Sequence, residues 1–128
     1  MSRIFKTDFF MRKTKKMEID DALLARAVEE MRTGLIDADL GGNVYKKRVP
    51  LSGHGKSGGA RTIVATCKGG HWFFLYAYAK NVRENITDNE LAAFRETASM
   101  FLALTDEQLD YLCKDGTLLE VSKNERDH

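Results

Sequence analysis

The sequence is poor in proline and cysteine and has no long hydrophobic run. It holds one Pro and two Cys among 128 residues. Cys67 and Cys113 lie far apart and outside any metal-ligand spacing, so we expect buried free thiols in a reducing compartment. The apolar run at 72–79 is too short to span a bilayer. Positive charges interrupt the N-terminal segment at 12–16, so we expect no secretion signal and a cytoplasmic location.

Acidic residues are absent from the middle of the chain. Between Leu40 and Arg83 there is no Asp or Glu, although the chain has 19 acidic and 20 basic residues in total. The formal net charge of +1 therefore hides a basic segment within an otherwise acidic chain. Positive charge concentrated beside aromatic residues is typical of proteins that bind polyanions, above all nucleic acids. The basic residues of this segment are Lys46, Lys47, Arg48, Lys56, Arg61, Lys68, Lys80 and Arg83.

The sequence also lacks the common catalytic and metal-binding motifs. It contains no Ser-His-Asp order, no HExxH motif, no paired-cysteine motif and no carboxylate dyad, so we expect neither a metal nor a cofactor. The glycine-rich loop at 52–59 is not a P-loop, because Pro50 stands where the first glycine is required and a strand follows the loop instead of a helix. Its glycines still allow a phosphate to approach the backbone closely.

Length and composition predict a single domain over residues 1–128, with a frayed tail at about 122–128. The hydrophobic fraction of 43% is enough for a modest core. The order of elements predicts an α+β fold, in which an N-terminal helix and C-terminal helices pack on a small antiparallel sheet built from consecutive hairpins.

Helix signals are the clearest local features. Asp20 is expected to cap a helix over 20–33 that ends at Gly34, and its apolar stripe consists of Leu24, Ala27, Val28 and Met31. Thr87 and Thr105 each begin a capping box. The predicted strands lie at 4–10, 44–50, 61–67 and 72–80, with a basic loop at 11–16, a turn-rich connection at 35–43 and a Gly-Gly turn at 68–71. Residues 118–121 either pair as a short edge strand or simply pack.

Alternation along the strands divides the cations between two faces of the sheet. Lys46 and Arg48 share one face, and Lys47 lies on the other. If the hairpins fold back on one another, Lys56, Arg61 and Lys80 converge at one end of the sheet. A solvated surface position is the commoner role of any single Lys, but several cations without a carboxylate need an anion to neutralise them.

Histidine and tyrosine are the other candidate functional residues. His54 lies in the glycine-rich loop and is suited to proton transfer, or else is a simple exposed loop residue. His71 follows a turn, where a structural role is expected. Most aromatic residues of the strand at 72–80 are expected in the core, and Tyr78 is the one candidate for stacking on a base.

Three motifs carry a resemblance to a known family. They are KKR at 46–48, GKSGGxR at 55–61 and YAxAKNxxxNI at 76–86, within a match that runs from Leu40 through the C-terminal helices. This series resembles the RelE/HigB-type toxins of bacterial type II toxin–antitoxin modules, in the RelE/ParE superfamily.

The resemblance implies a RelE-like fold and a ribosome-dependent mRNA endonuclease that inhibits translation and is neutralised by a cognate antitoxin. Cleavage in such toxins needs no metal, since the 2′-OH attacks the adjacent phosphate and basic side chains stabilise the phosphorane. The antitoxin commonly carries a DNA-binding domain, so operator DNA is bound only through it.

The resemblance also implies roles for individual residues. Arg61 matches the Arg of the GxR element and is expected to clamp the transition state, and Lys80 is expected to contact phosphate or assist proton transfer. Lys56 joins them as a catalytic candidate. The candidate contacts to RNA phosphates are Lys46, Lys47, Arg48, Arg83 and His54, with His54 chosen on chemistry alone. Residues 81–88 contain neither Tyr nor His, so the general base is left unassigned.

Two other functions fit the same fold. One is a gyrase-poisoning toxin without nuclease activity, and the other is a nucleic-acid-binding module that acts only with its antitoxin. The acid-free basic segment favours the nuclease, because a gyrase poison needs no convergent cationic site. Fold alone does not decide among them.

Overall fold

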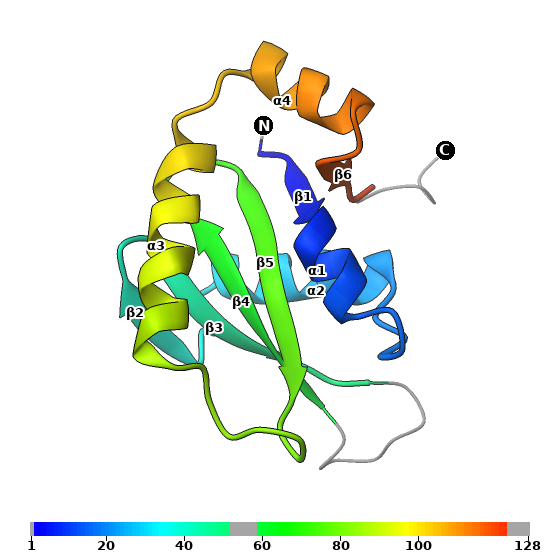
Figure 1. The fold of residues 1–128 in the computed structure, drawn as a ribbon, viewed down its shortest axis with the longest axis vertical. Coiled ribbons are helices and arrows are strands. Elements are labelled where there is room, and N and C mark those ends of the chain that lie inside the picture. The colour runs from blue at the N-terminus through cyan, green and yellow to red at the C-terminus, as the bar shows by residue number, and fades with distance from the viewer. Residues whose placement is uncertain (1, 52–58, 123–128) are drawn as a thin grey trace.

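The computed structural model describes residues 2–51 and 59–122, which form an α+β fold (Figure 1). One sheet holds six strands in the order β2-β3-β4-β5-β1-β6. The elements along the chain are β1 (Ile4–Thr7), α1 (Asp8–Lys13), α2 (Asp21–Arg32), β2 (Ala38–Gly41), β3 (Val44–Val49), β4 (Ala60–Thr66), β5 (Trp72–Ala79), α3 (Asp88–Leu102), α4 (Asp106–Lys114) and β6 (Leu118–Glu120).

Helices cover both faces of the sheet. The helix α3 packs on one face, where Phe94, Ala98 and Phe101 join buried residues of β4 and β5 in one apolar cluster. The helix α2 packs on the other face through its own apolar stripe. The strands β4 and β5 are buried on both sides because they lie between these two layers (Figure 1).

The helix predictions are confirmed. The side chain of Asp20 accepts a hydrogen bond from the Leu23 backbone, and α2 spans Asp21–Arg32 with its four stripe residues buried. Thr87 and Thr105 each form a complete capping box at the start of α3 and α4. Of the two alternatives for residues 118–121, the edge strand is the one observed, as β6 pairs antiparallel with β1.

Three local predictions are wrong. The first strand ends at Thr7, whose side chain accepts a hydrogen bond from the Phe10 backbone and starts α1, so part of the expected strand and basic loop is helical. The connection at 35–43 contains the strand β2. The two thiols are free but partly exposed rather than buried.

The sheet also differs from a series of consecutive hairpins. The strand β1 pairs parallel with β5 and antiparallel with β6, so the N-terminal strand is inserted between two C-terminal partners. These are long-range pairings, which local turn signals do not encode. The predicted hairpins β3–β4 and β4–β5 are present.

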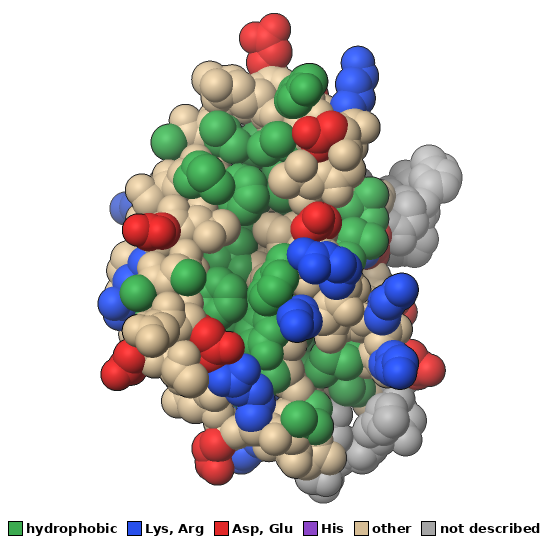
Figure 2. Space-filling view, viewed as in Figure 1, with side chains coloured by type: hydrophobic (Ala, Val, Ile, Leu, Met, Phe, Trp, Pro, Cys, Tyr) green, Lys and Arg blue, Asp and Glu red, His purple; other side chains and the backbone are tan. Residues whose placement is uncertain are grey.

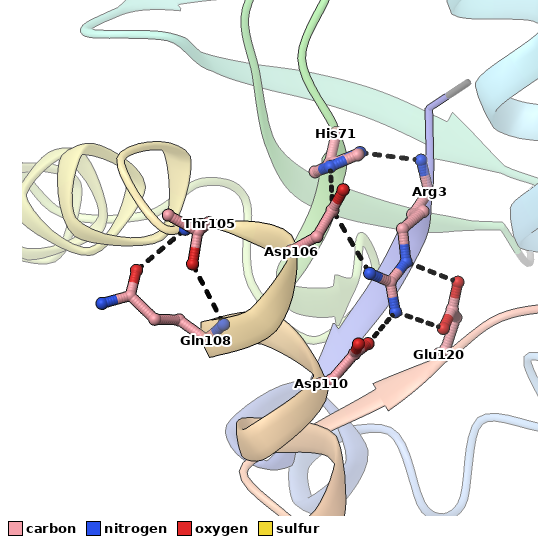
Figure 3. A network of polar contacts seen from close by, with 7 residues as sticks. All are labelled: Arg3, His71, Thr105, Asp106, Gln108, Asp110 and Glu120. Carbon is pink, nitrogen blue, oxygen red and sulfur yellow. Dashed lines mark hydrogen bonds and ion pairs between the residues drawn. The ribbon is translucent and has the colours of Figure 1, made fainter.

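Arg3 ties α4 to the sheet (Figure 3). Its Nη2 donates to Asp110 Oδ1 at 2.7 Å and to Glu120 Oε1 at 2.9 Å. His71 lies beside this network, with Nδ1 accepting the Arg3 backbone N–H at 2.9 Å and Nε2 at 3.1 Å from Asp106 Oδ1. His71 therefore has the structural role that its position after a turn predicted.

Candidate functional site

The pairing of three strands places basic residues on the face that α3 covers. Arg48 of β3 is the register partner of Arg61 of β4, and Arg61 is the partner of Tyr78 of β5. Paired residues of adjacent strands project from the same face of a sheet. Lys46 shares this face, because its partner Ile63 belongs to the cluster under α3.

Of the six predicted site cations that lie within the described residues, four are unpaired. Within residues 2–51 and 59–122, the side chains of these four residues make no ion pair and no hydrogen bond, although seven other Lys, Arg or His residues do form ion pairs. We call them the unpaired cation group: Lys46, Arg48, Arg61 and Lys80. Lys80 lies in the turn that begins directly after β5 and is exposed.

A β-bulge aims the aromatic residues of β5 at the same face. The register shifts between Ile63 and Val64, so that Ile63 pairs with Tyr76 and Val64 with Phe74, and Leu75 has no partner. Leu75 and Tyr76 consequently both pack on the α3 side. Bulges of this kind often re-aim side chains beside functional sites. Strict alternation along the strand could not have predicted it.

The two tyrosines on this face differ in exposure. Tyr78 is only 4% exposed, and burial raises the pKa of its hydroxyl, against the opposing effect of Arg61 and Arg83. Its ring offers little surface to a base. Tyr76 is partly exposed, and its ring lies at 5.9 Å from that of Tyr78.

Arg83, a predicted phosphate contact, is bound within the protein. Its guanidinium donates to both carboxylate oxygens of Glu90, at 2.6 Å and 3.0 Å, and to the Tyr76 hydroxyl at 3.1 Å. Glu90 also accepts the Thr87 backbone N–H in the capping box of α3. The positive charge of Arg83 is thus balanced by a carboxylate that is itself fixed in place.

Lys47, also a predicted phosphate contact, lies on the opposite face. It is 6% exposed, and its Nζ lies 2.8 Å from Glu30 of α2 and donates to the Leu35 carbonyl at 3.0 Å. Burial and a fixed partner make Lys47 a link between β3 and α2. The remaining two predicted residues, His54 and Lys56, lie outside the described residues.

The comparison with protein families agrees with the α+β fold. A family model described as the RelE toxin of the RelE/RelB toxin–antitoxin system matches residues 2–121. The chain belongs to the RelE toxin family. The resemblance noted in the sequence is therefore confirmed for the family. No curated protein sequence matches the chain.

As a RelE-family toxin, the protein acts opposite an antitoxin partner. In the described part of the chain, no helix is long and apolar enough to cross a membrane. The same residues contain no group of three His, Cys, Asp or Glu side chains placed to hold a metal ion. The candidate site of this RelE-family toxin consists of Lys and Arg side chains beside tyrosine rings.

The Arg83–Glu90 pair of this toxin makes stability depend on pH. Chiefly because Arg83 donates hydrogen bonds to it, the pKa of Glu90 is lowered to about 2 from 4.5. A lowered folded-state pKa adds stability that is present above pH 4.5 and is lost as the pH falls towards 2. Partial exposure of both side chains keeps this contribution small.

We therefore expect Glu90→Gln to reduce the loss of stability that the toxin shows as the pH falls. The free energy of unfolding, measured by urea titration between pH 6 and 2.5, falls less steeply in this variant than in the unmodified toxin. Glu96→Gln, which changes an exposed α3 carboxylate without a described ion pair, is the matched control. Equal slopes for Glu90→Gln and the unmodified toxin would contradict this assignment.

Proposed function

We propose that this RelE-family toxin inhibits translation as a ribosome-dependent mRNA endonuclease that needs no metal. The observation that supports it is the unpaired cation group, three members of which lie on the α3 face of the sheet. The side chains of Arg48 and Arg61, which occupy paired positions and form no ion pair within the described residues, repel one another and are stabilised by a bound polyanion. The phosphates of an RNA strand provide the anion, and a cationic site accelerates phosphodiester cleavage by electrostatic stabilisation.

The proposed reaction is an internal transfer at phosphorus. The 2′-OH loses its proton and attacks the adjacent phosphorus, the bond to the 5′ oxygen breaks, and that oxygen takes up a proton. The products are a 2′,3′-cyclic phosphate and a 5′-OH. Extra negative charge develops on the non-bridging oxygens of the phosphorane, so the protein groups that matter most are fixed cations.

Arg61 is the proposed clamp on these oxygens. A guanidinium can donate to two phosphate oxygens at once, and it remains charged at any working pH. Arg61 lies on the central strand β4 between Arg48 and Tyr78, so its backbone is held on both sides. A rigid strand positions a catalytic group better than a loop does.

Lys80 is the proposed second cation, which contacts phosphate or assists proton transfer. Lys46 and Arg48 are proposed to bind flanking phosphates of the strand. Lys56 and His54 keep the roles predicted from the sequence, as a catalytic cation and a phosphate contact. Their positions lie outside the described residues. Lys47 and Arg83 are left out of the site because each is paired with a carboxylate.

The proposed partners follow from this activity. The mRNA is cleaved on the ribosome, which places the toxin in the cytoplasm. The antitoxin blocks the toxin and is proposed to carry a DNA-binding domain, so operator DNA is reached only through the antitoxin.

The test is to induce the toxin alone in bacteria and to map the 5′ ends of cellular mRNAs. We expect growth arrest with new ends inside reading frames, in phase with codons. The same ends should be missing when the double variant Arg61→Ala, Lys80→Ala is induced to the same level.

The other outcomes distinguish the competing functions. Growth arrest without new mRNA ends would overturn the nuclease and favour a toxin of the gyrase-poisoning type. Ends that persist in the double variant would show a nuclease with a different site. Soluble toxin that causes no arrest would leave a binding module as the better explanation.

A further inference from the structure

An exposed phenylalanine lies beside the candidate site. Phe9 of α1 is 36% exposed, and its ring stacks on Tyr76 of β5, with centroids 5.7 Å apart and an interplanar angle of 28°. Tyr76 lies next to Tyr78, the register partner of Arg61. A line of aromatic rings thus runs from the proposed clamp to α1. The predicted function used none of the residues of α1.

Two cations flank the exposed ring. The guanidinium of Arg12 lies 5.6 Å from the centroid of Phe9, and the ammonium of Lys13 lies 5.4 Å from it. Arg12 also forms a loose pair with Asp8 at 3.6 Å, in which both side chains are exposed. Lys13 and the following Lys15 have no ion pair with any residue in the described ranges.

The arrangement is visible on the molecular surface. In Figure 2, Lys and Arg side chains gather over the position of α1, beside a hydrophobic strip that follows β5 between α1 and α3. Exposed aromatic rings with adjacent cations are the elements that bind single-stranded nucleic acid, since the rings stack on bases and the cations contact phosphates.

Given the proposed nuclease activity, we propose that α1 extends the site by one base-binding position. A nucleotide next to the cleaved step stacks on Phe9, and Arg12 and Lys13 bind the phosphates on either side of it. The ligand is single-stranded RNA, because an unpaired base alone exposes a free face to the ring. The stacking of Phe9 on Tyr76 holds the ring in place before the RNA arrives.

The test measures stacking directly. Ribosomes are programmed with an mRNA that carries 2′-O-methyl groups, which block the attack, and 2-aminopurine at one position of the reading frame. Stacking on an aromatic ring quenches the fluorescence of 2-aminopurine. Titration with the full-length toxin is expected to quench one position, and Phe9→Ala is expected to remove the quench and weaken binding roughly tenfold. Phe9→Trp should retain both.

Charge and surface controls complete the experiment. The double variant Arg12→Ala, Lys13→Ala should bind with a weaker dependence on salt. The slope of log K against log salt concentration should become shallower by about 0.7 for each phosphate that the variant no longer binds. Tyr111→Ala removes an exposed aromatic ring of α4, and Lys68→Ala removes an exposed cation of the turn before β5. Both controls should bind like the unmodified toxin.

Each contrary result has a distinct meaning. Full quenching and affinity in Phe9→Ala, with mRNA cleavage intact in the unmodified toxin, would overturn the role of α1 and leave the nuclease standing. Absence of both RNA binding and cleavage in the unmodified toxin would overturn the two together. Normal RNA binding by Phe9→Ala with lost neutralisation by the co-expressed antitoxin would assign the surface to the antitoxin.

Discussion

Arg61→Ala is expected to abolish growth arrest and to reduce mRNA cleavage by about 10²- to 10³-fold. Loss of one group that stabilises developing negative charge in a transition state has an effect of this size. Arg61 has no ion pair in the described structure, so its removal leaves no carboxylate unbalanced. The measurement is the rate of cleavage of a programmed mRNA by purified toxin, beside growth of induced cells.

Two further variants separate charge from geometry and from folding. Arg61→Lys keeps the charge but cannot donate two parallel hydrogen bonds, so we expect partial recovery well below the unmodified rate. Lys68→Ala, which removes another cation of the acid-free segment, should cleave normally. The free energy of unfolding of Arg61→Ala should change by less than about 0.5 kcal/mol. Full toxicity in normally expressed Arg61→Ala would place the site elsewhere.

Local chemistry made much of the fold predictable from the sequence. Asp20, Thr87 and Thr105 are caps whose hydrogen bonds involve residues three positions along the chain, so a short window contains all the information. The α2 stripe is equally local, because helical periodicity alone assigns its buried side. These are the features on which the sequence and the structure agree.

Most differences between the predicted and the observed fold come from pairing between distant segments of the chain. The end of the first strand is an exception, because Thr7 caps α1 through a hydrogen bond from Phe10, a local signal that the strand prediction missed. The pairing of β1 with β5, by contrast, joins segments far apart in the sequence. The bulge at Leu75 depends on how two strands meet. Propensity carries no information about either event, since tertiary context overrides it.

The candidate site shows the same division. Strand alternation predicted that Lys46 and Arg48 share one face of the sheet and that Lys47 lies on the other, and the strand pairing agrees. Sequence could not show that Lys47 and Arg83 are neutralised, since Glu30 and Glu90 lie outside the acid-free segment. An absence of acids along the chain is therefore no guarantee of their absence in space.

Phe73→Ala is expected to have the largest effect on stability. Phe73 is fully buried, and its ring stacks between Phe5 of β1 and Phe101 of α3, with both centroid distances 5.2 Å. Truncating a buried Phe lowers the free energy of unfolding by about 3–5 kcal/mol. Each ring pair that is removed is worth about 0.5–1.5 kcal/mol beyond its buried area.

This loss approaches the whole stability of a small domain, which is about 5–15 kcal/mol. Urea unfolding of purified toxin measures it, with Phe73→Leu as the control that refills most of the volume and should cost clearly less. A loss below about 1.5 kcal/mol at an unchanged urea dependence would contradict the central place of Phe73. Because this stack joins β1, β5 and α3, Phe73→Ala should lower toxicity by reducing the amount of folded protein. Phe9→Ala removes one ring pair, the stack on Tyr76, so its free energy of unfolding should fall by only about 0.5–1.5 kcal/mol. RNA binding is therefore compared under conditions in which both proteins are fully folded.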